Sequence, residues 1–177
     1  DNTYIFMSAD HGLACGSHGL LGKQNMYEHS MKPPMIVVGP SVPEGAQRDA
    51  FVYLQDIMAS SLDIAGVKKP AYVEFNSLMP LVRDAEATSN YDDVYGCFRK
   101  DLQRMIRNGD HKLNVYPGAN VVRLYNVGKD PLELEDLADN PENKGLIRKL
   151  FKRLLKLQQE MEDPLDLETY FPELLAG

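Results

Sequence analysis

The stretch YIFMSADHGLACGSHGLLGKQNMYEHSMKPPMIVVGP, residues 4–40, decides the fold of this chain. It begins and ends with short apolar runs, Tyr4–Met7 and Met35–Val38, which are typical of buried strands. A long glycine-rich segment joins the two runs. Because two strands cannot cover both faces of a sheet by themselves, we expect them to form part of a mostly parallel sheet in an α/β protein.

The segment between the two strands is rich in ionisable side chains. Asp10 and His11 follow the first strand directly, where α/β sheets place their ligands, and both residue types can bind a metal. Lys23 can approach an anion as a point charge, and His18 can either donate to an anion or cap the loop. A turn cap at Asp10 and a solvated Lys23 are the simpler alternatives. We hypothesise that this loop is half of a metal-and-anion site whose other half lies outside this chain.

The next part of the chain is predicted to contain one helix. Apolar residues recur at helical spacing over residues 51–65, and Gly66 follows as a C-terminal stop. Residues 68–87, interrupted by two prolines, are expected to be a loop. We interpret residues 1–88 as the C-terminal portion of a larger catalytic domain.

The second half has a different pattern, and residues 89–177 are interpreted as a small subdomain. Turn signals separate three of four strand candidates, from which we predict an antiparallel sheet of about four strands. These strands are expected at residues 91–98, 103–106, 112–116 and 121–125. An apolar stripe predicts a helix over 139–164, and the tail 165–177 is expected to pack loosely or to extend.

Composition excludes some functions. The chain has 177 residues, 44% of them hydrophobic, and a formal net charge of −7. Negative charge argues against nucleic acid as the main partner, and no apolar run approaches the roughly 20 residues of a membrane span. Lys149, Arg153 and Lys156 lie on one side of the last predicted helix, where a solvated face is favoured over an anion site.

Three motifs give the sequence a family resemblance. They are S-A-D-H-G at 8–12, G-S-H-G-L-L-G-K at 16–23 and Y-E-H-S-M-K-P-P-M-I-V-V-G-P at 27–40. Together with L-Y-N-V at 124–127 and the acidic and proline residues that follow, they resemble the type I sulfatases of the alkaline phosphatase superfamily. The resemblance extends to about Pro164 and implies an alkaline-phosphatase-like α/β sheet followed by a small antiparallel sheet with a C-terminal helix.

The resemblance also implies a chemistry. Type I sulfatases hydrolyse sulfate esters with a formylglycine nucleophile and a bound Ca²⁺. Asp10 and His11 match metal-ligand positions, although nitrogen is a poor ligand for Ca²⁺ and His11 is also expected to contact the sulfate or the nucleophile. Lys23 matches the lysine that holds the sulfate and stabilises its charge, with His18 as a further substrate-binding candidate.

The sequence departs from the family in two respects. It has no C/S-x-P/A-x-R motif, from which formylglycine is made, and it lacks the family's N-terminal pair of metal-binding aspartates. We therefore expect a C-terminal fragment that begins at Asp1, is inactive alone, and needs the missing N-terminal part of the same protein. The resemblance favours a periplasmic or extracellular location.

Two other functions stay open at this point. A phosphodiesterase or phosphonate monoester hydrolase of the same superfamily shares the D-H-G and lysine pattern. A non-catalytic module that binds a glycan or a protein partner belongs to a different class. For the enzyme, the expected substrate is a sulfated small molecule or glycan, and the sequence does not say which one.

Overall fold

The structure is a computed structural model that describes residues 2–175 of the chain. Two compact units make up the chain. Unit 1 comprises Asp1–Asp10 and Pro33–Asp92, and unit 2 comprises His11–Lys32 and Asp93–Gly177. The loop between the first two strands therefore groups with the C-terminal half, while the division into domains at residues 88 and 89 stays a prediction.

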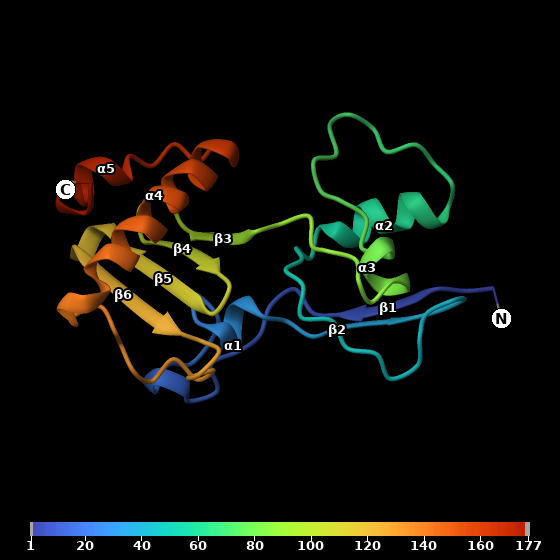
Figure 1. The fold of residues 1–177 in the computed structure, drawn as a ribbon, viewed down its shortest axis with the longest axis horizontal. Helices are drawn as coiled ribbons and strands as arrows, with labels where there is room; N and C mark the ends of the chain where they lie inside the picture. Colours follow the sequence, from blue (N-terminus) through green and yellow to red (C-terminus); the bar gives the residue numbers. More distant parts are fainter. Residues whose placement is uncertain (1, 176–177) are drawn as a thin grey trace. The chain divides into compact units, whose positions relative to one another are not determined.

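Unit 1 opens with two strands, β1 (Ile5–Ser8) and β2 (Met35–Val38), which pair antiparallel (Figure 1). We expected both in a mostly parallel sheet, and such sheets often carry an antiparallel edge strand, so the pairing agrees with the α/β class. Burial on both faces was expected, but the strands alternate between half-buried and exposed residues. One face carries four exposed apolar side chains, between 51% and 58% accessible: Ile5, Met7, Ile36 and Val38.

The helices of unit 1 are α2 (Asp56–Ile64) and α3 (Met79–Arg83). Helix α2 begins five residues later than predicted, because the buried Asp56 carboxylate accepts hydrogen bonds from the backbone N–H groups of Tyr53 (2.8 Å) and Asn76 (3.1 Å). Helix α3 lies in a segment predicted to be a loop. Its proline, Pro80, occupies the first turn, where a helix needs no N–H donor.

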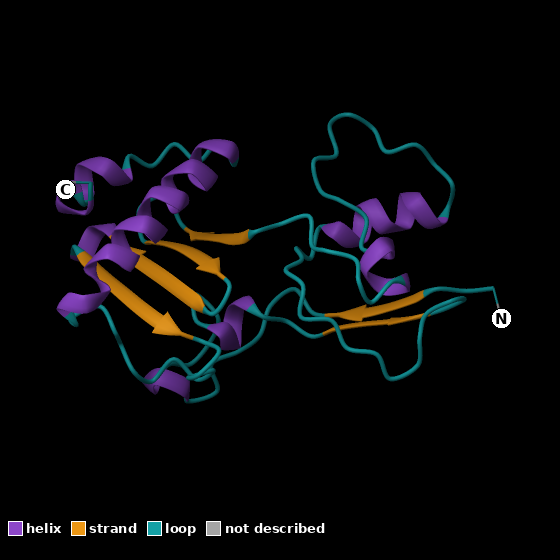
Figure 2. Cartoon of the chain, viewed as in Figure 1, coloured by secondary structure: helices purple, strands orange, loops and turns teal. Residues whose placement is uncertain are grey.

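Unit 2 contains the predicted antiparallel sheet, with strand order β3-β4-β5-β6 (Figure 2). Its strands are β3 (Asp93–Phe98), β4 (Gln103–Asn108), β5 (His111–Tyr116) and β6 (Val121–Asn126). Helix α4 (Lys144–Glu160) covers one face of this sheet. Short 3-10 turns lie at η1 (Ser17–Gly19), η2 (Pro117–Ala119), η3 (Pro141–Asn143) and η4 (Pro172–Leu174).

The core of unit 2 lies between α4 and the sheet. Ile106, Leu113 and Leu124 from the strands are fully buried against Leu150 and Phe151 of the helix. Burying side chains of this size contributes roughly 1.5–3 kcal/mol each, so this interface dominates the stability of the unit. The C-terminal helix is confirmed, with the 3-10 turn η3 in place of its predicted first residues.

The tail does not pack as loosely as expected. Residues Leu167–Tyr170 form the short helix α5, and the side chains of Leu167 and Phe171 are fully buried. The Phe171 ring lies edge-on to the Phe151 ring, with centroids 5.9 Å apart. Leu167 and Phe171 are four residues apart, so both side chains lie on the same side of this segment and pack together against α4. Within residues 2–175, no helix combines the length and the apolar composition that crossing a membrane requires.

Candidate functional site

The loop His11–Lys32 covers the sheet face of unit 2 that α4 leaves open. Alternate residues of a strand point to opposite faces, so the neighbours of the core residues point toward this loop. A Cβ atom at Gly96 of β3 would lie 2.7 Å from Met31 and 3.3 Å from the sulfur of Met26, both loop residues. Helix α1 (Glu28–Met31) belongs to this loop and contacts the sheet through Glu28, which bonds to Lys112 of β5. The sheet therefore has a cover on each face (Figure 1).

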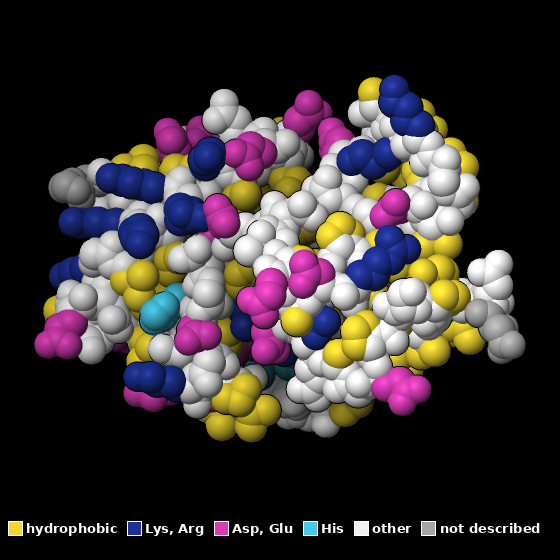
Figure 3. Space-filling model, turned by 45° about the vertical axis from the view of Figure 1, so that its right-hand side comes forward, with side chains coloured by type: hydrophobic (Ala, Val, Ile, Leu, Met, Phe, Trp, Pro, Cys, Tyr) yellow, Lys and Arg dark blue, Asp and Glu magenta, His cyan; other side chains and the backbone are white. Residues whose placement is uncertain are grey.

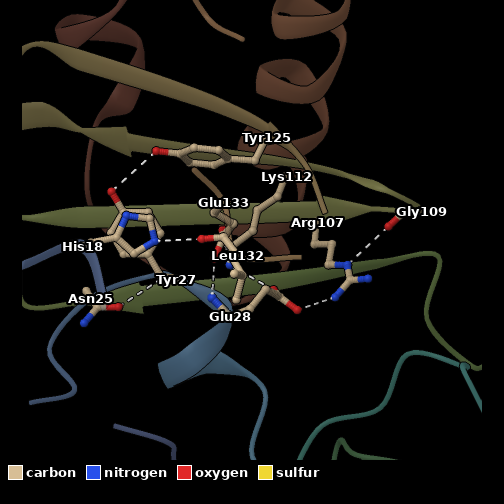
Figure 4. Close-up of polar contacts among 10 residues, drawn as sticks. All are labelled: His18, Asn25, Tyr27, Glu28, Arg107, Gly109, Lys112, Tyr125, Leu132 and Glu133. Atoms are coloured by element: carbon tan, nitrogen blue, oxygen red, sulfur yellow. Dashed lines mark hydrogen bonds and ion pairs between the residues drawn. The ribbon is translucent and has the colours of Figure 1, made fainter. Parts of the chain in front are cut away.

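A network of four charges, two of them fully buried, attaches this loop to the sheet (Figure 4). We call Glu28, Arg107, Lys112 and Glu133 the charge network. The Lys112 ammonium lies 2.9 Å from Glu28 Oε1 and 3.0 Å from Glu133 Oε1, and Arg107 Nη1 lies 2.6 Å from Glu28 Oε2. Two cations thus balance two carboxylates. The side chains of Lys112 and Glu133 are 0% and 2% exposed, so losing Lys112 would leave the Glu133 carboxylate buried without its cation.

Glu133 also holds the loop through its backbone. Its Oε2 accepts a hydrogen bond from the N–H of Glu28 at 2.6 Å, at the first residue of α1. A carboxylate at this position satisfies a free N–H donor and interacts favourably with the helix N-terminus. The network therefore fixes both the side chain and the start of the helix that carries Glu28.

Three rings pack beside the charge network. The His18 ring stacks on Tyr27 with centroids 3.8 Å apart, and His29 lies 5.7 Å from the same tyrosine. His18 Nε2 contacts the Leu132 carbonyl at 3.0 Å, which requires the proton on Nε2 and leaves Nδ1 with a lone pair. In this arrangement, His18 ties the loop to the segment before Glu133.

Burial lowers the pKa of His29, and the nearby His18 and Lys112 lower it further. His29 is therefore neutral at pH 7. The preceding residue, Glu28, bonds through its side chain to Arg107 and Lys112. Consecutive residues of a helix point in different directions, so His29 and Glu28 have different surroundings.

The backbone next to His11 is held closely against α1. A Cβ atom at Gly12 would lie 1.9 Å from the His29 carbonyl oxygen, and the Gly12 N–H donates to the Ser30 carbonyl at 3.1 Å. Only glycine allows this approach. His11 Nδ1 contacts the Gly12 carbonyl at 3.0 Å, which favours the proton on Nδ1 and a lone pair on Nε2.

The predicted site residues are distributed over both units. Asp10 belongs to unit 1 and is exposed, two residues past β1, whereas His11, His18 and Lys23 belong to unit 2. Their assigned roles stay predictions. A carboxylate oxygen, as on Asp10, and an imidazole Nε2 lone pair, as on His11, are both donors that divalent metals can use. Within residues 2–175, no group of three His, Cys, Asp or Glu side chains is arranged to hold a metal.

Sequence reasoning missed the three partners of Glu28. Lys112 lies in β5 between His111 and the buried Leu113, and alternation alone predicts that such a lysine faces solvent. Glu133 follows Asp130-Pro131 in the segment after β6, and its φ of 56° places it in the left-handed region. A non-glycine residue in that region is uncommon. This backbone conformation marks Glu133 as unusual, but it is visible only in the structure and not in the sequence.

The architecture and the loop motifs together define the C-terminal part of a sulfatase. The chain belongs to the family described as "N-sulphoglucosamine sulphohydrolase, C-terminal", which matches residues 16–160. Arylsulfatase K of Homo sapiens is 30% identical over 148 residues, covering 77% of this chain and 28% of that protein. Choline-sulfatase of Rhizobium meliloti (strain 1021) is 32% identical over 146 residues, covering 80% of this chain and 28% of that protein.

Solved structures share the fold. BT4656, solved in complex with its substrate D-glucosamine-2-N,6-O-disulfate, superposes with a TM-score of 0.83 at 24% identity, covering 91% of this chain and 35% of that one. The phosphonate monoester hydrolase SpPMH from Silicibacter pomeroyi superposes with a TM-score of 0.78 at 20% identity, with the same coverage. This chain thus spans little more than a quarter of the curated relatives named above.

Proposed function

We propose that this chain supplies one side of the active site of a sulfuric ester hydrolase, and that the nucleophile comes from polypeptide outside it. Family membership over residues 16–160 is the observation that carries the proposal. The buried charge network supports it, because it gives the loop with His11, His18 and Lys23 a defined position on the sheet. The chain alone is then inactive.

In this proposal, Lys23 binds a sulfate oxygen and stabilises the charge that develops as the sulfur centre is attacked. Asp10 provides an oxygen ligand to a divalent cation, for which we propose Ca²⁺, and His11 either completes a second ligand position or contacts the sulfate or the nucleophile. Because Ca²⁺ takes six to eight oxygen ligands, the remaining ligands come from outside this chain. When bound, the metal orients the sulfate and lowers its negative charge toward an incoming nucleophile, which we propose to be formylglycine.

The substrate class follows by analogy with relatives. Choline-sulfatase is named for a small sulfate ester, and BT4656 binds a doubly sulfated glucosamine. We therefore propose a sulfated small molecule or glycan as the substrate, and a periplasmic or extracellular location for the protein.

The exposed apolar face of β1 and β2 also fits this proposal. Ile5, Met7, Ile36 and Val38 present hydrophobic side chains that unit 1 leaves more than half accessible. Contiguous apolar surface of this kind usually marks an interface. We propose that further sheet of the same complete protein covers it.

The competing function is phosphonate monoester hydrolysis, because SpPMH shares the fold. The complete protein, assayed with Ca²⁺, should hydrolyse 4-nitrophenyl sulfate with a higher kcat/KM than 4-nitrophenyl phenylphosphonate. A higher kcat/KM for the phosphonate would favour the competing hydrolase. If neither ester is hydrolysed, the non-catalytic module is the better account.

A further inference from the structure

Helix α4 carries a dense row of cations in an acidic chain. Its 17 residues include six Lys or Arg and one acidic residue, whereas the chain as a whole has 19 basic and 26 acidic residues. We call five of these cations the basic stripe: Lys144, Arg148, Lys149, Lys152 and Lys156. The sixth, Arg153, forms an ion pair with the buried Asp93 and is thereby neutralised.

The basic stripe occupies the outer side of α4. Lys144, Arg148, Lys152 and Lys156 follow one another at four-residue spacing, which places neighbours on the same side about 6 Å apart and makes the row about 18 Å long. The four lysines are exposed and Arg148 is half-buried. Figure 3 shows dark blue side chains gathered on this part of the surface. The opposite side of the helix is buried in the core.

This charge arrangement works against the stability of the helix. Like charges four residues apart repel each other, and Lys144 lies at the N-terminus, where the helix dipole disfavours a cation. Helix α4 has no acidic residue in its first turn and no basic residue in its last turn. Within the part of the chain that the structure describes, Lys156 has Glu160 at 3.6 Å, whereas no ion pair involves Lys144, Arg148, Lys149 or Lys152. A bound polyanion would relieve this repulsion.

We propose that the basic stripe is a docking surface for a linear sulfated polysaccharide. It lies on the side of the sheet opposite the loop His11–Lys32, so it is separate from the residues assigned to hydrolysis. Lysine ammonium groups act as compact point charges, which suit isolated sulfate groups. The proposal stands on α4 alone and does not require the chain to take part in catalysis. If the complete protein also hydrolyses such a polymer, docking at the basic stripe would raise the local concentration of that substrate near its active site.

Two other polyanionic partners fit the stripe less well. Single-stranded nucleic acid is bound through aromatic stacking as well as charge, and the aromatic ring of α4, that of Phe151, is fully buried. An anionic membrane is bound by helices whose apolar face enters the lipid, but the apolar face of α4 packs against the sheet. Both partners are outcomes that the experiment below can distinguish.

The test uses the 177-residue chain, dextran sulfate as the probe and uncharged dextran as the matched polymer. The stripe variant combines Lys144→Gln, Lys149→Gln and Lys152→Gln, and glutamine keeps a high helix propensity. The control variant combines Lys68→Gln, Lys100→Gln and Lys129→Gln, three exposed lysines elsewhere. Both variants lose three positive charges, so a difference between them reports the position of the charge.

We expect the wild-type chain to bind dextran sulfate, not dextran, with an affinity that falls as salt rises. The stripe variant should bind about tenfold or more weakly, with a shallower salt dependence, while the control variant keeps most of the affinity. Equal losses in both variants would overturn the proposal. Tighter binding to single-stranded DNA or to anionic vesicles than to dextran sulfate would also overturn it.

A second measurement keeps the proposal testable if the stripe variant does not fold. Bound dextran sulfate should protect Lys149 and Lys152 of the wild-type chain from chemical acetylation and leave Lys68 and Lys100 reactive. Uniform protection of all four lysines, or protection of none, would contradict the proposal.

Discussion

Lys112 Nζ lies 2.9 Å from Glu28 Oε1, although 84 residues separate the two in the sequence. Lys112 belongs to the middle of the antiparallel sheet and Glu28 to the loop that covers it. This ion pair therefore connects the part of the chain that resembles a sulfatase site to the C-terminal part. It gives the antiparallel sheet a function beyond packing, namely to position that loop.

The first prediction concerns this ion pair. Lys112→Met should lower the free energy of unfolding by about 3–5 kcal/mol, because Glu133 stays buried and loses its cation. Urea denaturation of the chain measures this change. Lys129→Met, at an exposed lysine of the same unit, is the control and should change stability by less than about 0.5 kcal/mol. A loss below about 1 kcal/mol for Lys112→Met would show that the network contributes little.

The second prediction concerns the backbone at Gly12. Gly12→Ala should destabilise the chain by about 1–3 kcal/mol, because the new Cβ would lie 1.9 Å from the His29 carbonyl oxygen. Gly145→Ala is the matched control, since a Cβ there meets nothing within 4 Å. It should stabilise α4 by about 0.5–1 kcal/mol. Equal effects of the two substitutions in thermal unfolding would refute the close approach.

The third prediction concerns pH. The pKa of His29 is lowered in the folded chain from its ordinary value of 6.5, so the unfolded chain binds the proton more readily. Stability contributed by neutral His29 is complete above pH 6.5 and is lost as the pH falls toward the lowered pKa. Unfolding by urea at a series of pH values measures this. His29→Gln should have a smaller loss of stability between pH 7 and pH 5, and an identical loss would contradict the assignment.

The fourth prediction concerns the tail. Phe171→Ala should lower the free energy of unfolding by about 3–5 kcal/mol, because the ring is fully buried against Phe151. The neighbouring Tyr170 is 40% exposed, so Tyr170→Ala should have a clearly smaller effect and serves as the control. If both variants unfold at the same urea concentration, the tail is not part of the core.

Local patterns predicted the elements whose signals are contained in a few residues. The strands β3 to β6 were expected from turn signals and their antiparallel pairing followed, and α4 was expected from its apolar stripe. The tail was mispredicted, because Leu167 and Phe171 gain their burial from α4 and not from any pattern of their own. Short helices such as α3 are stabilised mainly by tertiary packing, so the prolines around it were misleading.

The candidate site was predictable in a different way. The motifs identified Asp10, His11 and Lys23 by resemblance. The sequence did not show which residues hold their loop on the sheet. Glu28 lies in the motif at 27–40, and its partners Lys112 and Glu133 lie 84 and 105 residues away. Long-range pairing of this kind depends on which segment covers the second face of a sheet. That information is absent from the strand pattern itself.

The most direct test of the central claim is the hydrolysis of 4-nitrophenyl sulfate by the complete protein carrying Lys23→Ala. We predict that kcat falls by about 10²–10³, because the cation that stabilises the developing charge on the sulfate is lost. Lys32→Ala, at a second exposed lysine of the same loop, should leave kcat unchanged. A Lys23→Ala enzyme that turns over the ester as fast as the wild type would contradict the account.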